Sequence, residues 1–143
     1  MRMRILGLDI GSKTIGVACS DALGITAQGI TTIQRKTAKD DWQRLQALAT
    51  ERWVTRMVVG RPRHMNGEDS ENVKQIEAFI TYLKRQMPAM EFVYWDERLT
   101  TMMARQVLMA GGVRREKRKQ FVDKMAAILI LQNYLDAQGN TLL

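Results

Sequence analysis

The sequence contains few of the residues that build the commonest catalytic sites. Its 143 residues include one cysteine, one histidine, two prolines and three each of Trp, Tyr and Phe. The single Cys19 excludes an internal disulfide framework and a cysteine zinc site, and His64 leaves no histidine pair for a metal. A serine or cysteine triad would depend on His64 alone, so carboxylates are the better catalytic candidates. Such scarce cysteine is typical of a cytoplasmic protein.

Long hydrophobic runs are also missing. The longest, Met125–Leu131, has seven residues, whereas a membrane span needs about twenty. Asp9 interrupts the first apolar stretch, so we expect neither a membrane association nor a secretory signal. Negative charge is in the minority, because 22 Lys and Arg against 15 Asp and Glu give +7 at pH 7. This surplus favours a polyanionic partner, although solvated surface lysines would give the same count.

The order of apolar segments predicts one domain over residues 1–143, of the α/β class. Three short apolar runs at 5–10, 14–20 and 29–34 are joined by turns and predict an antiparallel meander. Helical and strand patterns then alternate. We predict helices near 40–53, 73–83, 100–110 and 120–137, and strands near 57–60 and 92–95. Together these elements indicate a mixed five-stranded sheet flanked by helices.

Local signals refine the helices. Asp40 and Gln43 have the spacing of a capping box at a helix start. Trp42, Trp53 and Phe79 fit the core faces of helices, so no base-stacking platform is visible.

The first strand contains an unusual acid. Asp9 lies inside an apolar run, with Gly7 and Gly11 on its own face if the strand is regular. Small neighbours let a metal or a large anion approach the carboxylate. A hydrogen bond from a neighbouring strand or turn would account for the acid equally well.

Three further acids follow later elements. Asp96 and Glu97 come directly after the last strand, at the end of an open sheet where ligands gather. Adjacent strand residues point to opposite faces, so only one of the two can share a site with Asp9. Asp123 lies near the start of the last helix, where the helix dipole alone would favour an acid. Acids from these three places could converge on one or two divalent ions for phosphodiester hydrolysis.

Four motifs occur in order along nearly the whole chain. They are GLDIGSKTIGVA at 7–18, GRPRHMNG at 60–67, DERLTT at 96–101 and VDKMAA at 122–127, the last followed by Leu131-Gln132. Together they resemble the bacterial YqgF family, which is described both as Holliday junction resolvases and as pre-16S ribosomal RNA nucleases.

The resemblance implies a ribonuclease H-like fold and a metal-dependent endonuclease that hydrolyses phosphodiester bonds in structured nucleic acid. It implies that Asp9, Glu97 and Asp123 are catalytic and bind Mg²⁺ or Mn²⁺, with Asp96 as the alternate to Glu97. The implied substrate is the 5′ end of pre-16S rRNA in the cytoplasm. The alternatives are a resolvase of four-way DNA junctions and a nucleic-acid-binding module without catalysis, each as a monomer or homodimer.

Basic residues are concentrated before the last acid. Residues 114–119 hold five Lys or Arg and one Glu, so five minus one gives +4 of the total +7. We predict a flexible, basic segment that draws a phosphate backbone toward Asp123; a solubilising loop is the alternative. The chain also departs from the family pattern, which usually has Leu at Arg61 and Arg63, Asn at His64 and often an acid at Met103. The residues predicted to contact nucleic acid are Lys13, Arg61, Arg63, Arg98, Arg114, Arg115, Lys117, Arg118 and Lys119.

Overall fold

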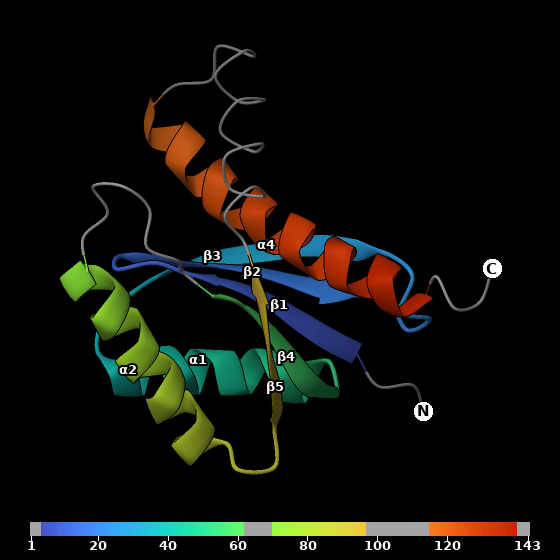
Figure 1. Ribbon diagram of the computed structural model, residues 1–143, viewed down its shortest axis with the longest axis horizontal. Helices are drawn as coiled ribbons and strands as arrows, with labels where there is room; N and C mark the ends of the chain where they lie inside the picture. Colours follow the sequence, from blue (N-terminus) through green and yellow to red (C-terminus); the bar gives the residue numbers. More distant parts are fainter. Residues whose placement is uncertain (1–3, 62–69, 97–114, 140–143) are drawn as a thin grey trace.

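A mixed sheet with helices on both faces forms the centre of the molecule (Figure 1). The computed structural model describes residues 4–61, 70–96 and 115–139. Within this part of the chain the sheet has five strands in the order β3-β2-β1-β4-β5. The mixed sheet predicted from the sequence is therefore confirmed.

The first three strands are antiparallel neighbours. They are β1 (Arg4–Ile10), β2 (Thr14–Ser20) and β3 (Ala27–Gln34). The β1–β2 turn is closed by a hydrogen bond of 2.8 Å from the Gly11 amide to the Thr14 carbonyl. This tight reversal follows Asp9 by two residues, so the acid lies close to the end of its strand.

The remaining strands are parallel to β1, and helices connect them. Strand β4 (Val54–Arg61) pairs with β1, and β5 (Glu91–Asp96) pairs with β4. Helix α1 (Ala38–Glu51) precedes β4, α2 (Ser70–Gln86) connects β4 to β5, and α4 (Arg115–Gly139) comes last. Figure 1 shows α1 and α2 on one side of the sheet and α4 on the other. No helix in the described ranges is both long and apolar enough to cross a membrane.

Strand alternation divides the core between these two sides. Even-numbered residues of β1, such as Leu6 and Leu8, pack in the larger core with α1 and α2, and odd-numbered residues face α4. The smaller core on the α4 side contains Ala18, Val58, Ala127, Ile130, Leu131, Tyr134 and Leu135. By this alternation Asp9 lies on the α4 side of the sheet. Cys19 lies on the other side, in the core with α1 and α2.

Helix α1 begins and ends differently from the prediction. Thr37 is its N-cap, and the Thr37 hydroxyl accepts a hydrogen bond of 3.1 Å from the Asp40 amide. The predicted Asp40–Gln43 capping box is therefore wrong, because the helix begins one turn earlier. Trp53 is 56 % exposed and has a φ of 53°, in the turn that follows the helix. Its assignment to a helix core face is also wrong, because the chain reverses there into β4.

The last helix is longer than predicted. It begins at Arg115, so the residues predicted as a flexible basic segment are helical from 115 to 119. A run of Lys, Arg and Glu is compatible with that conformation, since these residues are strong helix formers. The helix predicted near 100–110 lies outside the described residues.

Candidate functional site

Asp9 is carried by β1, the central strand of the sheet, near the end of that strand. It is half-buried on β1, next to β2 on one side and β4 on the other, and pairs in register with Gly16. Both neighbouring strands are hydrogen-bonded to β1, so the backbone that carries this carboxylate is rigid.

Helix α4 packs directly on the backbone of β1. A Cβ atom built on Gly7 would lie 2.6 Å from the Leu131 Cβ and 3.0 Å from the Ala127 carbonyl oxygen. Real Cβ contacts are essentially never that short. Gly7 is required here because it lets the helix approach the sheet two residues before Asp9.

Contacts along α4 define its direction relative to β1. Arg56 pairs in register with Ile5 near the start of β1, and its Nη1 donates a hydrogen bond of 2.7 Å to the Tyr134 hydroxyl. A second hydrogen bond, from Arg56 to Glu91, raises the pKa of the guanidinium and is the largest cause of that shift. Farther along β1, Gly7 faces earlier residues of the helix. The helix therefore runs opposite to β1.

This direction brings two of the predicted acids to one end of the sheet. Asp9 lies two residues beyond Gly7, about 6.7 Å along the strand. Asp123 lies four residues before Ala127, about 6 Å along the helix. Because strand and helix run in opposite directions, both displacements point the same way. The backbones of Asp9 and Asp123 are thus at a similar position along the direction of β1, on the α4 side of the sheet.

The third predicted acid is only partly located. Asp96 is the last residue of β5 and pairs in register with Arg61, and Glu97 lies outside the described residues. On the preceding residue, Trp95, the ring packs edge-on against Tyr134 of α4, with ring centroids 5.7 Å apart. Within the described part of the chain, no three His, Cys, Asp or Glu side chains form a metal-binding group.

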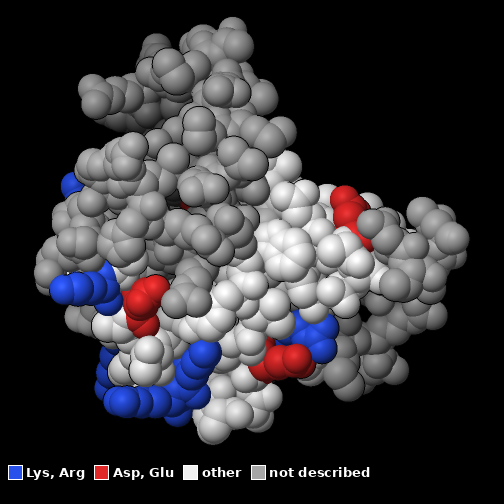
Figure 2. All heavy atoms as spheres, viewed as in Figure 1, with Lys and Arg blue, Asp and Glu red and all other residues white. Residues whose placement is uncertain are grey.

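The predicted nucleic-acid contacts are distributed over several elements. Lys13 is exposed in the β1–β2 turn, and Arg61 ends β4. Arg115, Lys117, Arg118 and Lys119 occupy the first turns of α4, and Arg63, Arg98 and Arg114 lie outside the described residues. On the face drawn in Figure 2, basic side chains also gather over α2, whose last turn contains Lys84 and Arg85. Positive charge is therefore not confined to the segment before Asp123.

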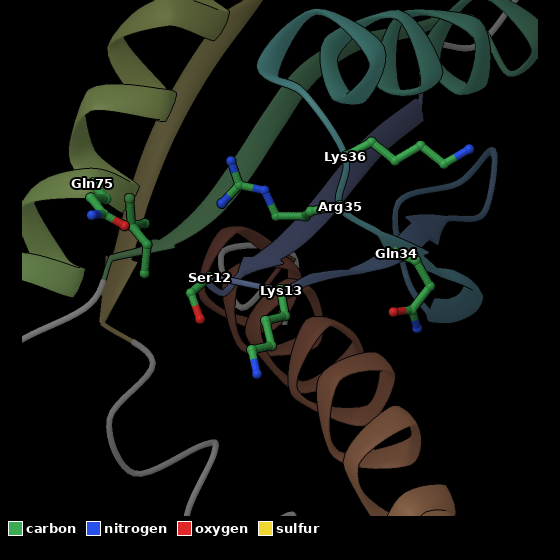
Figure 3. A pocket seen from close by; sticks show the side chains of 7 residues that line it. Ser12, Lys13, Gln34, Arg35, Lys36 and Gln75 are labelled. Atoms are coloured by element: carbon green, nitrogen blue, oxygen red, sulfur yellow. The ribbon is translucent and has the colours of Figure 1, made fainter.

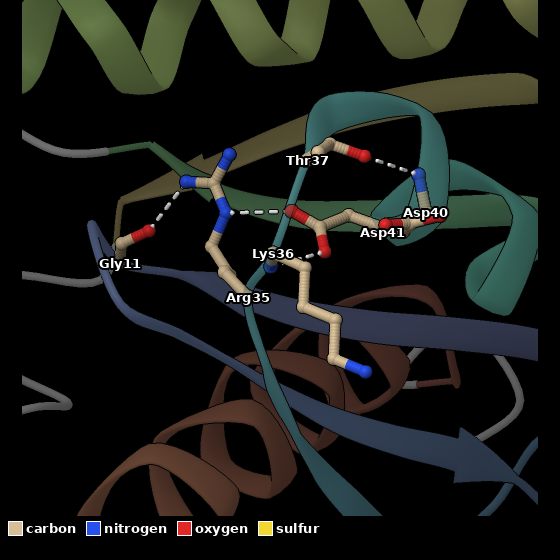
Figure 4. Close-up of polar contacts among 6 residues, drawn as sticks. All are labelled: Gly11, Arg35, Lys36, Thr37, Asp40 and Asp41. Carbon is tan, nitrogen blue, oxygen red and sulfur yellow. Dashed lines mark hydrogen bonds and ion pairs between the residues drawn. The ribbon is translucent and has the colours of Figure 1, made fainter.

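Sequence reasoning missed a clamp that holds the turn after Asp9 (Figure 4). Arg35 donates from Nη1 to the Gly11 carbonyl at 2.7 Å and from Nε to the Asp41 carboxylate at 3.1 Å. The Asp41 carboxylate is 1 % exposed and also accepts a hydrogen bond of 3.0 Å from the Lys36 amide. The clamp ties the β1–β2 turn to the start of α1. The signal in the sequence is the position of Asp41, four residues before Leu45 and eight before Ala49, on the face of the helix that faces the core.

Cys19 is not part of this arrangement. It lies on the opposite side of the sheet from α4, and burial raises the pKa of its thiol. A protonated, buried thiol is a poor nucleophile.

Solved structures with a similar fold define the class to which this fold belongs. The fold is similar to that of Thermus thermophilus RuvC in complex with Holliday junction substrate, with a TM-score of 0.57, 15% identity and 98% of each chain covered. The Fowlpox virus resolvase in complex with substrate Holliday junction DNA gives a TM-score of 0.55 at 15% identity, covering 95% of this chain and 99% of that one. The protein therefore has the ribonuclease H-like fold of RuvC-type proteins.

Sequence comparison identifies the family within that class. The chain belongs to the RuvX family, whose model is described as Holliday junction resolvase and matches residues 3–137. This is the YqgF family that the four motifs resemble. A relative from Halalkalibacterium halodurans is 49% identical over 95% of this chain and 98% of its own. Another, from Heliobacterium modesticaldum, is 49% identical over 96% and 92%. Both carry the name "Putative pre-16S rRNA nuclease".

Proposed function

We propose that the protein is a nuclease that hydrolyses phosphodiester bonds in structured nucleic acid and processes the 5′ end of pre-16S rRNA in the cytoplasm. The names of relatives at 49% identity over nearly the full chain support the RNA substrate. The observation that supports the proposal is the opposed direction of β1 and α4, from which we infer that Asp9 and Asp123 share one end of the sheet.

The proposed catalytic set is Asp9, Glu97 and Asp123. The resemblance of residues 96–101 to the family motif favours Glu97 over Asp96. Carboxylate oxygens are hard donors that suit Mg²⁺ or Mn²⁺. When bound, such ions activate a water molecule and stabilise the leaving oxygen in phosphodiester hydrolysis.

The protein's own residues supply rigidity and charge. The sheet holds Asp9 in place, and the Arg35–Asp41 clamp holds the turn that follows it. The basic residues in the first turns of α4 precede Asp123 on the same helix. They would attract the phosphate backbone to this end of the sheet without reading its sequence.

The test is Asp9→Asn, which keeps the shape of the side chain and removes its charge. We expect cleavage of a pre-16S rRNA leader with magnesium present to fall more than about 100-fold, since loss of even an outer-shell partner of a metal ligand costs about 10–100-fold. Binding of the leader, measured in chelator, should persist. The matched control is Asp40→Asn, an exposed acid in the first turn of α1.

The result also separates catalysis from mere binding. A nucleic-acid-binding module would bind the leader with or without magnesium and show no turnover in wild type. Cleavage that survives Asp9→Asn undiminished would remove Asp9 from the catalytic set.

A further inference from the structure

We propose that a pocket beside the β1–β2 turn binds a backbone phosphate of the nucleic-acid substrate, as a subsite apart from the predicted acids; this rests on the proposed function. The pocket has a volume of about 410 Å³. Three segments form it: the turn after β1, the chain between β3 and α1, and α2 (Figure 3). Its lining includes Ser12, Lys13, Gln34, Arg35, Lys36 and Gln75.

The chemistry of the lining suits an anion that accepts hydrogen bonds. The described residues around the pocket include three basic side chains, one hydroxyl and two amides, and no carboxylate. Arg35 is already engaged by Asp41 and the Gly11 carbonyl. Lys13 and Lys36 are exposed and form no ion pair with any residue that the structure describes. Two uncompensated lysines therefore remain for a ligand.

The turn after β1 and the chain before α1 are fixed next to each other by their backbones. The Arg35 amide donates a hydrogen bond of 2.8 Å to the Lys13 carbonyl, so the segments that carry Lys13 and Lys36 are joined. Figure 3 shows the Arg35 guanidinium pointing toward Gln75 of α2, while the two lysine side chains extend from the rim in different directions. Thr37, the N-cap of α1, follows Lys36 directly, and the positive end of the helix dipole adds to the local potential.

The distance from Asp9 suits a neighbouring phosphate of the same strand. Lys13 is four residues after Asp9, so the two Cα atoms are at most about 14 Å apart. A nucleic-acid strand carries one charge per about 3.4 Å of helix axis, so this reach corresponds to at most about four nucleotides. Asp9 faces α4, whereas the pocket lies beside α2 on the other side of the sheet, so a strand held at Asp9 reaches the pocket by passing over the β1–β2 turn.

The test compares Lys36→Ala with Lys39→Ala. Lys39 is an exposed lysine three residues away on α1 that does not line the pocket, so both variants lose one surface charge. Affinity for a pre-16S rRNA leader and for a four-way DNA junction is measured in chelator between 50 and 200 mM salt. We expect Lys36→Ala to reduce the slope of log K against log salt by about 0.7–0.9, the loss of one phosphate contact. Lys39→Ala should leave the slope unchanged.

The outcomes distinguish a failure of the subsite from a failure of the proposed function. If Lys36→Ala and Lys39→Ala behave alike, the subsite is rejected and the nuclease proposal stands. If Lys36→Ala lowers the slope but wild type shows no cleavage with magnesium, the subsite stands and the nuclease proposal fails. If wild type binds neither nucleic acid, both are rejected.

Discussion

Asp41 and Arg35 illustrate how single residues position the site. Asp41 is one of the few buried polar residues in the described part of the chain, and it lies on α1 rather than beside Asp9. Arg35 connects it to the turn after Asp9 and also stacks over the Phe79 ring, 4.2 Å from its centroid. The pair thus connects the β1–β2 turn, α1 and α2.

We predict that Asp41→Ala destabilises the protein by about 3 kcal/mol. Removing one partner of a buried pair leaves the other charge uncompensated, which costs about 3–5 kcal/mol, and Arg35 is partly exposed, which favours the low end. The free energy of unfolding in urea measures the effect. The neighbouring Asp40→Ala serves as control and should cost less than about 1 kcal/mol, because Asp40 is exposed in the first helical turn. Equal losses in the two variants would show that the clamp contributes no specific stability.

At the scale of elements, the contact between α4 and β1 decides whether the predicted acids can share a site. The helix approaches so closely because Gly7 has no side chain. Gly29 on β3 is also covered by α4, but there the nearest atoms belong to the flexible side chains of Lys124 and Ile128. An added Cβ at Gly7 would therefore meet the backbone of α4, whereas one at Gly29 would meet only side chains.

We predict that Gly7→Ala costs about 1–3 kcal/mol through overpacking, because the new methyl group meets the Leu131 Cβ and a backbone carbonyl. Gly29→Ala should be close to neutral, since a Lys124 terminus can move aside and a strand loses little by gaining a methyl group. Thermal unfolding of the two variants side by side measures this difference. A Gly7→Ala protein as stable as Gly29→Ala would mean that α4 can shift away from β1 at no cost.

The elements themselves were largely predictable from the sequence. The apolar runs at 5–10 and 14–20 and the Gly-Ser-Lys turn between them act locally, so the hairpin was expected. The start of α1 was missed because Thr37 precedes Trp42, the first large apolar residue of the helix, by more than one turn. Trp53 was misassigned because its spacing continues the helical period, and only the backbone reversal removes it from the helix.

For the molecule as a whole, the fold is similar to that of junction resolvases, and two relatives at 49% identity bear the name "Putative pre-16S rRNA nuclease". Phosphate contacts serve both substrates, so charge alone does not distinguish them. Symmetric resolution of a four-way junction needs two active sites related by a two-fold axis. Oligomeric state therefore bears directly on the choice.

We predict that the protein cuts a pre-16S rRNA leader and does not resolve a four-way DNA junction into symmetric paired nicks. Both substrates are compared at equal protein concentration with magnesium, and light scattering gives the oligomeric state under the same conditions. Asp9→Asn is the control for contaminating nucleases. Symmetric cutting of the junction by a dimer, with the RNA leader intact, would favour the resolvase alternative.

Most elements, the antiparallel meander and the family were readable from the sequence, because turn chemistry, hydrophobic period and ordered motifs are local properties of the chain. The sequence also identified Asp9 and Asp123 as candidates. The folded molecule was needed to show that α4 runs opposite to β1, that Gly7 lets it pack closely, and that Asp41 binds Arg35 and, through it, the turn after Asp9. Such contacts depend on how helices pack on the sheet, and residues far apart in sequence carry no local signal of that packing.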